Sequence, residues 1–74
     1  MKAYLAFSLP EDTSEFTLAS KGVDWACVSF ALDNWLRNQL KYGHSFQSAD
    51  EALEAARTEL HQELDNHDVT FDML

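Results

Sequence analysis

The apolar residues between positions 25 and 40 recur every three or four residues, and this spacing constrains the fold more than any other feature of the sequence. An α-helix places residues three or four apart on one side, whereas a half-buried strand would alternate. The residues that follow the helical period are Trp25, Val28, Leu32, Trp35, Leu36 and Leu40. Ala26 and Phe30 widen the apolar side, which predicts a helix covered on more than one side. Asp24 is a suitable N-cap, and Gly43 a suitable end.

Signals for a helix start also occur before this segment. Ser8 and Glu11 match the capping box, in which a Ser side chain and a Glu three residues later each accept a backbone N–H. Pro10 is tolerated in a first helical turn. The pattern predicts a first helix that runs to about Lys21 and stops at Gly22. The residues expected to face its core are Leu9, Phe16, Leu18 and Ala19.

A second capping box, Ser48 with Glu51, predicts a third helix that ends near Asn66. Its apolar stripe would be Ala49, Leu53, Ala56, Leu60 and Leu64. Residues 3–7 and 69–74 alternate weakly between apolar and polar, which predicts short extended or β-like ends that can pair. The predicted fold class is mainly α: a compact three-helix domain over residues 1–74 with short extended or β-like N- and C-terminal segments.

The size of the chain limits its core. A domain of 74 residues is marginal without a staple or a partner. Cys27 is the single cysteine, so no internal disulfide forms, and a lone cysteine suits a reducing cytoplasm. We find no signal-peptide pattern and no segment near the roughly 20 apolar residues of a membrane span, so a cytoplasmic protein is expected. The sequence leaves open a monomer or a weak homodimer.

Most of the negative charge lies in the last third of the chain. The net charge is −8, and residues 48–74 alone carry −7, with Arg57 as their one cation. An acidic chain repels nucleic acid and anionic lipid and attracts basic surfaces. We therefore expect neither direct nucleic-acid binding nor membrane binding, but docking onto a cationic groove of a nucleic-acid-binding protein complex. A DNA-binding regulator is disfavoured, because it would need a basic recognition helix.

The third helix would carry this charge on one side. Asp50, Glu54, Arg57, His61 and Asp65 recur at three or four residues, about 5–6 Å apart along the axis, a spacing that a phosphate row could share. The carboxylates expected to act as phosphate surrogates are Asp50, Glu51, Glu54, Glu59, Glu63, Asp65 and Asp68, with Asp72 a weaker candidate. The alternative is a solvated helix face that keeps a small protein soluble.

Chemistry on a substrate is not expected. His61 and His67 are six residues apart, so they point in different directions on a helix, and no zinc-protease motif is present. Cys27 would lie in a first helical turn but among apolar neighbours, where cysteine acts as a small apolar residue. With only Gly22 and Gly43, there is no glycine-rich phosphate loop. We expect a non-enzyme without metal or cofactor.

Residues 9–43 resemble a group of small phage- and prophage-encoded proteins. The matching positions are Leu9-Pro10-Glu11, Glu15-Phe16, Ala19, Gly22, Asp33, Leu36-Arg37 and Lys41-Tyr42-Gly43. The resemblance implies a context in which small acidic phage proteins act against host machinery, as anti-CRISPR proteins do. Some of those proteins look like DNA mimics that occupy the target-DNA channel of a Cas complex, which is cationic because it holds a nucleic-acid backbone. The resemblance transfers no binding residue to this chain.

Charge and resemblance together favour a phage-type inhibitor that works in the host cytoplasm. It would bind a host complex through an acidic, DNA-mimicking surface and block target DNA binding, with the type I CRISPR surveillance complex Cascade as the first target to test. The alternative is a protein–protein interaction module or homodimer that binds through apolar and aromatic residues. Its contacts would come from Trp25, Trp35, Phe71, Met73 or Leu74.

Overall fold

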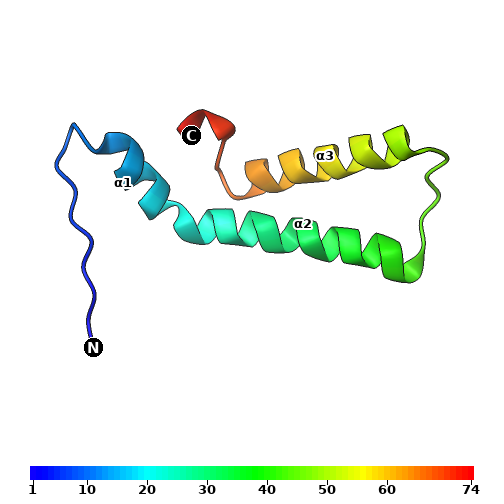
Figure 1. The fold of residues 1–74 in the computed structure, drawn as a ribbon, viewed down its shortest axis with the longest axis horizontal. Helices are drawn as coiled ribbons and strands as arrows, with labels where there is room; N and C mark the ends of the chain where they lie inside the picture. The colour runs from blue at the N-terminus through cyan, green and yellow to red at the C-terminus, as the bar shows by residue number, and fades with distance from the viewer.

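The computed structural model describes residues 1–74 and contains three α-helices, one short 3₁₀ helix and no strand. In chain order these are α1 (Thr13–Ser20), α2 (Gly22–Tyr42), α3 (Ala49–Asn66) and η1 (Phe71–Met73). Helices α2 and α3 lie side by side and antiparallel, α1 continues beyond the N-terminal end of α2, and the N-terminal segment extends away from them (Figure 1). The mainly α fold class with three helices is confirmed.

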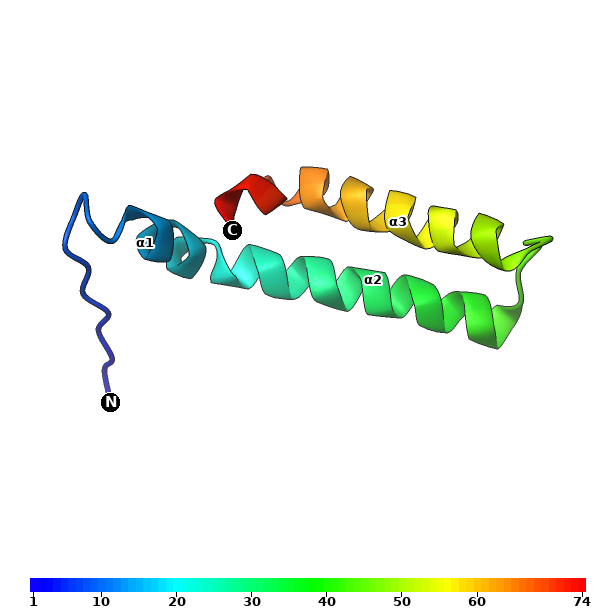
Figure 2. The same cartoon turned by 45° about the horizontal axis from the view of Figure 1, so that its top comes forward.

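The molecule is elongated, because most of the chain lies in the layer formed by α2 and α3. Its principal extents are 51 × 30 × 17 Å and its radius of gyration is 16.5 Å. A globular chain of this length has a radius of gyration of about 11 Å. Figure 2 shows from a second direction that neither α1 nor the N-terminal segment folds back over the α2–α3 hairpin. The outer sides of both long helices are therefore open.

The core lies at the end of the hairpin where α3 leads into the C-terminal tail. It consists of Val28 from α2, Leu64 from α3 and Val69 from the tail, which are 2%, 3% and 1% exposed. The partly buried residues packed against it are Trp25, Leu60 and Met73. Phe71 stacks on Trp25 with ring centroids 6.0 Å apart. The tail therefore forms the third side of a core that two helices alone would leave open.

The predicted ends of α3 and the end of α2 are confirmed. The Ser48 hydroxyl accepts a hydrogen bond from the backbone N–H of Glu51 at 3.2 Å, which is the N-cap bond expected of a serine. The Glu51 carboxylate accepts from the N–H of Gln47 at 3.2 Å. Gly43 ends α2 with a φ of 91°, a backbone conformation that is unfavourable for residues other than glycine.

Replacing Ser48 with Ala should destabilise the chain by about 1 kcal/mol, because an N–H at the start of α3 loses its acceptor. Urea unfolding followed by far-UV circular dichroism measures this change. Ser45→Ala is the matched control: Ser45 is exposed in the preceding loop and accepts a hydrogen bond only through its backbone carbonyl. Equal losses of stability in the two variants would contradict the capping role.

The predicted start of the first helix is wrong. Helix α1 begins at Thr13, and the segment from Ser8 forms a turn in which its N–H donates to Asp12 Oδ2 at 2.9 Å. A residue before proline avoids the helical conformation. Leu9 precedes Pro10 and so cannot be the first helical residue after a Ser8 cap. The proline therefore belongs to the turn that precedes the helix.

The predicted boundary between the first two helices is also displaced. Gly22 is the first residue of α2 rather than the residue that stops α1, and Lys21 joins the two helices. Because the Trp25 N–H donates to the Lys21 carbonyl at 3.0 Å, Asp24 lies inside the first turn and is not the N-cap. The residues of the first helix that were predicted to face a core are mostly exposed. Phe16 and Ala19 of α1 and Leu9 of the preceding turn are exposed, while Leu18 is half-buried.

The predicted pairing of the two chain ends does not occur. The N-terminal segment is extended, as expected, but it lies apart from the tail (Figure 1). The tail forms the 3₁₀ helix η1 instead of a strand. Asp68 adopts a φ of 54°, where the chain turns after α3 and carries Val69 into the core. Burial of Val69 therefore outweighs the weak strand pattern of this segment.

Candidate binding surfaces

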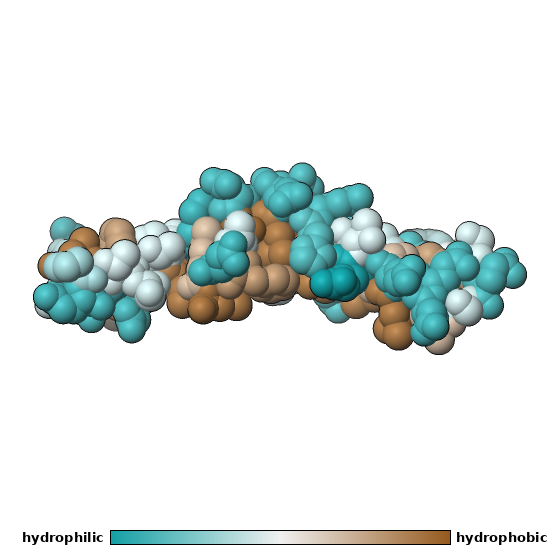
Figure 3. Space-filling view, turned by 90° about the horizontal axis from the view of Figure 1, so that it is seen from above, coloured by the Kyte–Doolittle hydropathy of each residue, from teal (hydrophilic) through white to brown (hydrophobic).

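The outer side of α3 is a polar surface with a shallow groove. The residues that line it are Glu54, Arg57, Thr58, His61, Gln62 and Asp65. None of them is apolar, and all are exposed. Figure 3 shows hydrophilic residues over much of the upper side of the molecule. Four members of the predicted row, Glu54, Arg57, His61 and Asp65, thus lie on one surface that faces away from α2. The fifth, Asp50, is exposed near the start of α3 and does not line the groove.

The structure divides the predicted phosphate surrogates into two groups. The exposed ones are Asp50, Glu51, Glu54, Asp65 and Asp68. Glu59 and Glu63 are half-buried on the side of α3 that approaches α2. Helix α3 is rotated so that Ala56 and these two glutamates share its inward side with Leu60. Glu59 and Glu63 are therefore poorly placed to meet a partner that docks on the outer side.

Several exposed carboxylates already have partners within the chain. Glu51 accepts the backbone hydrogen bond from Gln47, and Asp68 Oδ2 lies 3.9 Å from Lys21 Nζ. Asp50, Glu54 and Asp65 have neither a hydrogen bond nor an ion pair. These three side chains are the freest candidates for contacts with another molecule.

The acidic surface is interrupted at its centre. Arg57 and His61 lie between Glu54 and Asp65, which are about 16 Å apart along the helix axis. The exposed carboxylates therefore lie towards the two ends of α3, around Asp50 at one end and around Asp65 at the other. A partner that matches this surface would place one group of cations opposite each end of α3 and no cation opposite Arg57 and His61.

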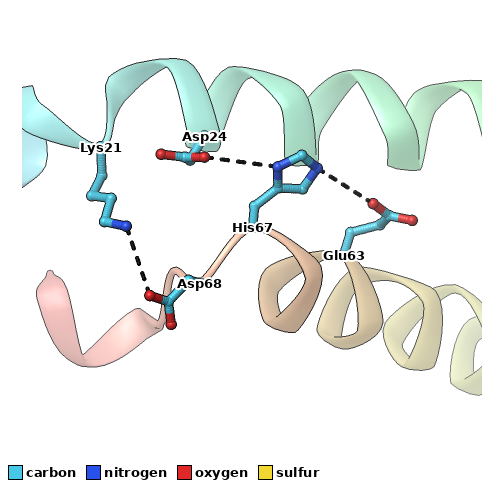
Figure 4. A network of polar contacts seen from close by, with 5 residues as sticks. All are labelled: Lys21, Asp24, Glu63, His67 and Asp68. Atoms are coloured by element: carbon cyan, nitrogen blue, oxygen red, sulfur yellow. Dashed lines mark ion pairs between the residues drawn. The ribbon is translucent and has the colours of Figure 1, made fainter.

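A second polar cluster joins the end of α3 to the start of α2 (Figure 4). His67 lies between two carboxylates, with Nδ1 3.8 Å from Asp24 Oδ1 and Nε2 3.8 Å from Glu63 Oε2. Both distances exceed hydrogen-bond length, so the attraction is electrostatic and requires a protonated imidazole. The cluster places His67 between a carboxylate of α2 and a carboxylate of α3. No group of three or more His, Cys, Asp and Glu side chains has an arrangement that could hold a metal ion.

The two tryptophans are both half-buried. Trp25 packs against the core and Phe71, while Trp35 lies near Phe46, with ring centroids 6.3 Å apart. Cys27 is exposed on α2 rather than packed among apolar residues. Neither tryptophan stands out from the surface as an isolated anchor.

Sequence reasoning missed a set of exposed leucines. Leu36, Leu40 and Leu53 were assigned to apolar stripes, yet they are 40%, 84% and 68% exposed. Towards the 43–48 loop, the two helices border an apolar cleft lined by Trp35, Leu36, Gln39, Leu40, His44, Phe46 and Ala52. The width of the apolar side of α2 was the available signal, because one neighbouring helix covers only part of it.

None of the helices combines the length and the apolar character needed to span a membrane. In comparisons with known proteins, no family model, no curated protein and no solved structure matches this chain.

Proposed function

We propose that this chain is a binding protein that docks on a cationic surface of a nucleic-acid-binding complex and competes with the nucleic acid. The observation that supports this most directly is the set of three exposed, unpartnered carboxylates on α3, namely Asp50, Glu54 and Asp65, of which Glu54 and Asp65 line the groove on its outer side. No chemical step is part of the proposal. The chain acts by occupying a surface.

The physical basis is attraction between exposed charges of opposite sign. Residues 48–74 carry a net charge of −7, and the unpartnered exposed carboxylates of α3 lie towards its two ends, Asp50 and Glu54 at one and Asp65 at the other. The roughly 16 Å between Glu54 and Asp65 correspond to about five steps along one DNA strand at about 3.4 Å each. Two groups of lysines or arginines that bind DNA phosphates at that separation could instead bind the carboxylates at the two ends of α3.

The first target to test is a type I CRISPR surveillance complex. This choice rests on the resemblance of residues 9–43 to small phage-encoded proteins and on the cationic channel in which such complexes hold DNA. The assay titrates the chain against purified Cascade and labelled target duplex at about 50 mM and about 200 mM salt. Competition should weaken at least tenfold at the higher salt, because exposed charges are screened.

Reversing the free carboxylates should abolish competition. In the double variant Glu54→Lys with Asp65→Lys, both ends of the acidic surface turn positive, and we expect at least a hundredfold loss of potency. The matched control is Glu11→Lys with Glu15→Lys, which makes the same change in net charge at exposed positions outside α3. Far-UV circular dichroism verifies that all chains stay helical. If both double variants lose potency equally, net charge alone matters and the surface on α3 is not the binding site.

A second candidate function is an interaction module that binds through apolar contacts. The observation that favours it is the number of large apolar residues left exposed on the helices, among them Val23, Phe30, Leu36, Leu40 and Leu53. An apolar interface of this kind would be insensitive to salt or strengthened by it. The same competition assay at two salt concentrations therefore separates the two candidates.

A further inference from the structure

One long edge of the α2–α3 hairpin is made of leucines. Leu32, Leu36 and Leu40 follow each other at four-residue spacing on α2, so they form one stripe. Leu53 and Leu60 lie seven residues apart on α3, which places them on one side of that helix. We call these five residues the leucine edge. Phe71 of the tail lies between Trp25 and His61 and covers the neighbouring part of the same edge.

The opposite edge of the hairpin has a different character. Its residues include Cys27, Asn34, Asn38 and Asn66, which are exposed and small or polar. In Figure 3 apolar residues gather at the middle of the lower edge and again towards its right end, whereas hydrophilic residues dominate the middle of the upper edge. The hairpin is thus amphipathic across its width. An exposed apolar edge of this kind marks a contact with another protein.

The chain has a larger solvent-accessible surface than a compact monomer of its mass. Its accessible surface is 6061 Å², whereas a compact monomer of 8.4 kDa exposes about 4,600 Å². The extended N-terminal segment accounts for part of this surplus of about 1,400 Å². A stable interface removes about 800 Å² from each partner. The surplus is large enough for an interface with a second copy.

We infer that the leucine edge is the contact between two copies of this chain, which together form a four-helix bundle. A two-fold axis parallel to the helices would place α2 of each copy, antiparallel, against α3 of the other. This is a self-complementary contact, so one patch serves both chains. Leu40 and Ala52 line the same cleft and therefore lie at the same height along the hairpin. Leu40 of one copy would then meet Leu53 of its partner.

The charges on the rim of the edge fit this arrangement. Asp33 follows Leu32 on α2, and Arg57 lies between Leu53 and Leu60 on α3. Both are exposed, and neither has an ion-pair partner within the chain. Placing α2 against α3 of the second copy brings each Asp33 to the side on which the partner presents Arg57. The arrangement thus brings together two pairs of opposite charge, Asp33 of each copy with Arg57 of the other.

The first test is the molar mass of the full chain, measured by sedimentation equilibrium against concentration. We expect a dimer of twice the 8.4 kDa chain mass. In the variant Leu40→Glu with Leu53→Glu the dissociation constant should rise at least a hundredfold. The matched control is Val23→Glu with Phe30→Glu, the same change at residues 78% and 73% exposed elsewhere on α2. All four substituted positions are exposed, so far-UV circular dichroism should show helical chains throughout.

The outcomes separate the leucine edge from other surfaces. A monomer at every concentration would overturn the proposal. If Val23→Glu with Phe30→Glu dissociates the dimer and the leucine variant does not, the contact lies on the other side of α2 and the leucine edge is excluded. Equal weakening in both variants would also overturn the assignment, because it would reflect added charge rather than a lost contact.

A cross-linking experiment tests the arrangement of the helices. Leu40→Cys and Leu53→Cys chains are made in a Cys27→Ser background, which removes the natural thiol. On mild oxidation, a mixture of the two should form disulfide-linked dimers at least tenfold faster than either chain alone. Faster linkage in Leu40→Cys alone would show α2 packed against α2 and would overturn the proposed pairing.

This dimer does not depend on the carboxylates of α3, and salt distinguishes it from binding to a cationic partner. Each copy carries a net charge of −8, so screening of their repulsion should tighten the dimer as salt rises. Binding to a cationic partner should weaken over the same range. A dimer that dissociates at about 200 mM salt would contradict an apolar contact and leave the acidic-surface proposal untouched.

Discussion

Replacing Leu64 with Ala is expected to leave most of the chain unfolded at room temperature. Leu64 is one of only three buried side chains, and it is 3% exposed. A Leu→Ala change in a core costs about 2–5 kcal/mol, because apolar contact is lost and a cavity stays behind. A domain of this size rarely has more than about 3–5 kcal/mol of stability in total. One substitution therefore removes most of what holds α2, α3 and the tail together.

Thermal unfolding followed by far-UV circular dichroism measures this effect, at one fixed protein concentration for all chains. Leu5→Ala is the matched control, because it is the same substitution at a residue that is 81% exposed in the N-terminal segment. It should change the stability by less than about 0.5 kcal/mol. A Leu64→Ala chain as stable as Leu5→Ala would mean that the buried cluster is not the centre of the fold.

Helix ends that depend on short-range hydrogen bonds could be predicted from the sequence. The Ser48 cap acts within three residues, and Gly43 ends α2 by its own backbone freedom, so neither depends on the rest of the fold. Gly22 is also a glycine and would suit the end of a helix equally well, yet it is the first residue of α2. A glycine permits a helix end without requiring one. The first-turn position of Asp24 follows from that earlier start.

The sides of the helices were harder to predict than their ends. Helical spacing placed Glu54 and Asp65 together on α3, and the structure agrees. The spacing could not tell that Glu59 and Glu63 lie towards α2, because the rotation of α3 depends on how Leu64 and Val69 pack. Nor could it tell that the stripe leucines Leu36, Leu40 and Leu53 would stay exposed. An apolar stripe indicates burial, but not whether the partner belongs to the same chain.

The contribution of the tail to stability could not be predicted from the sequence. Removing the tail should destabilise the chain as much as replacing Leu64 with Ala. Val69 is 1% exposed and, without residues 69–74, Val28 and Leu64 would face water. Fully burying one such side chain contributes about 1.5–3 kcal/mol, so the shortened chain should lose its cooperative thermal transition. Removing residues 1–6 is the matched control, because it deletes the same number of residues, all exposed, and keeps Phe7 against Phe16. That chain should unfold at nearly the original temperature. Two shortened chains of equal stability would show that α2 and α3 hold together without the tail.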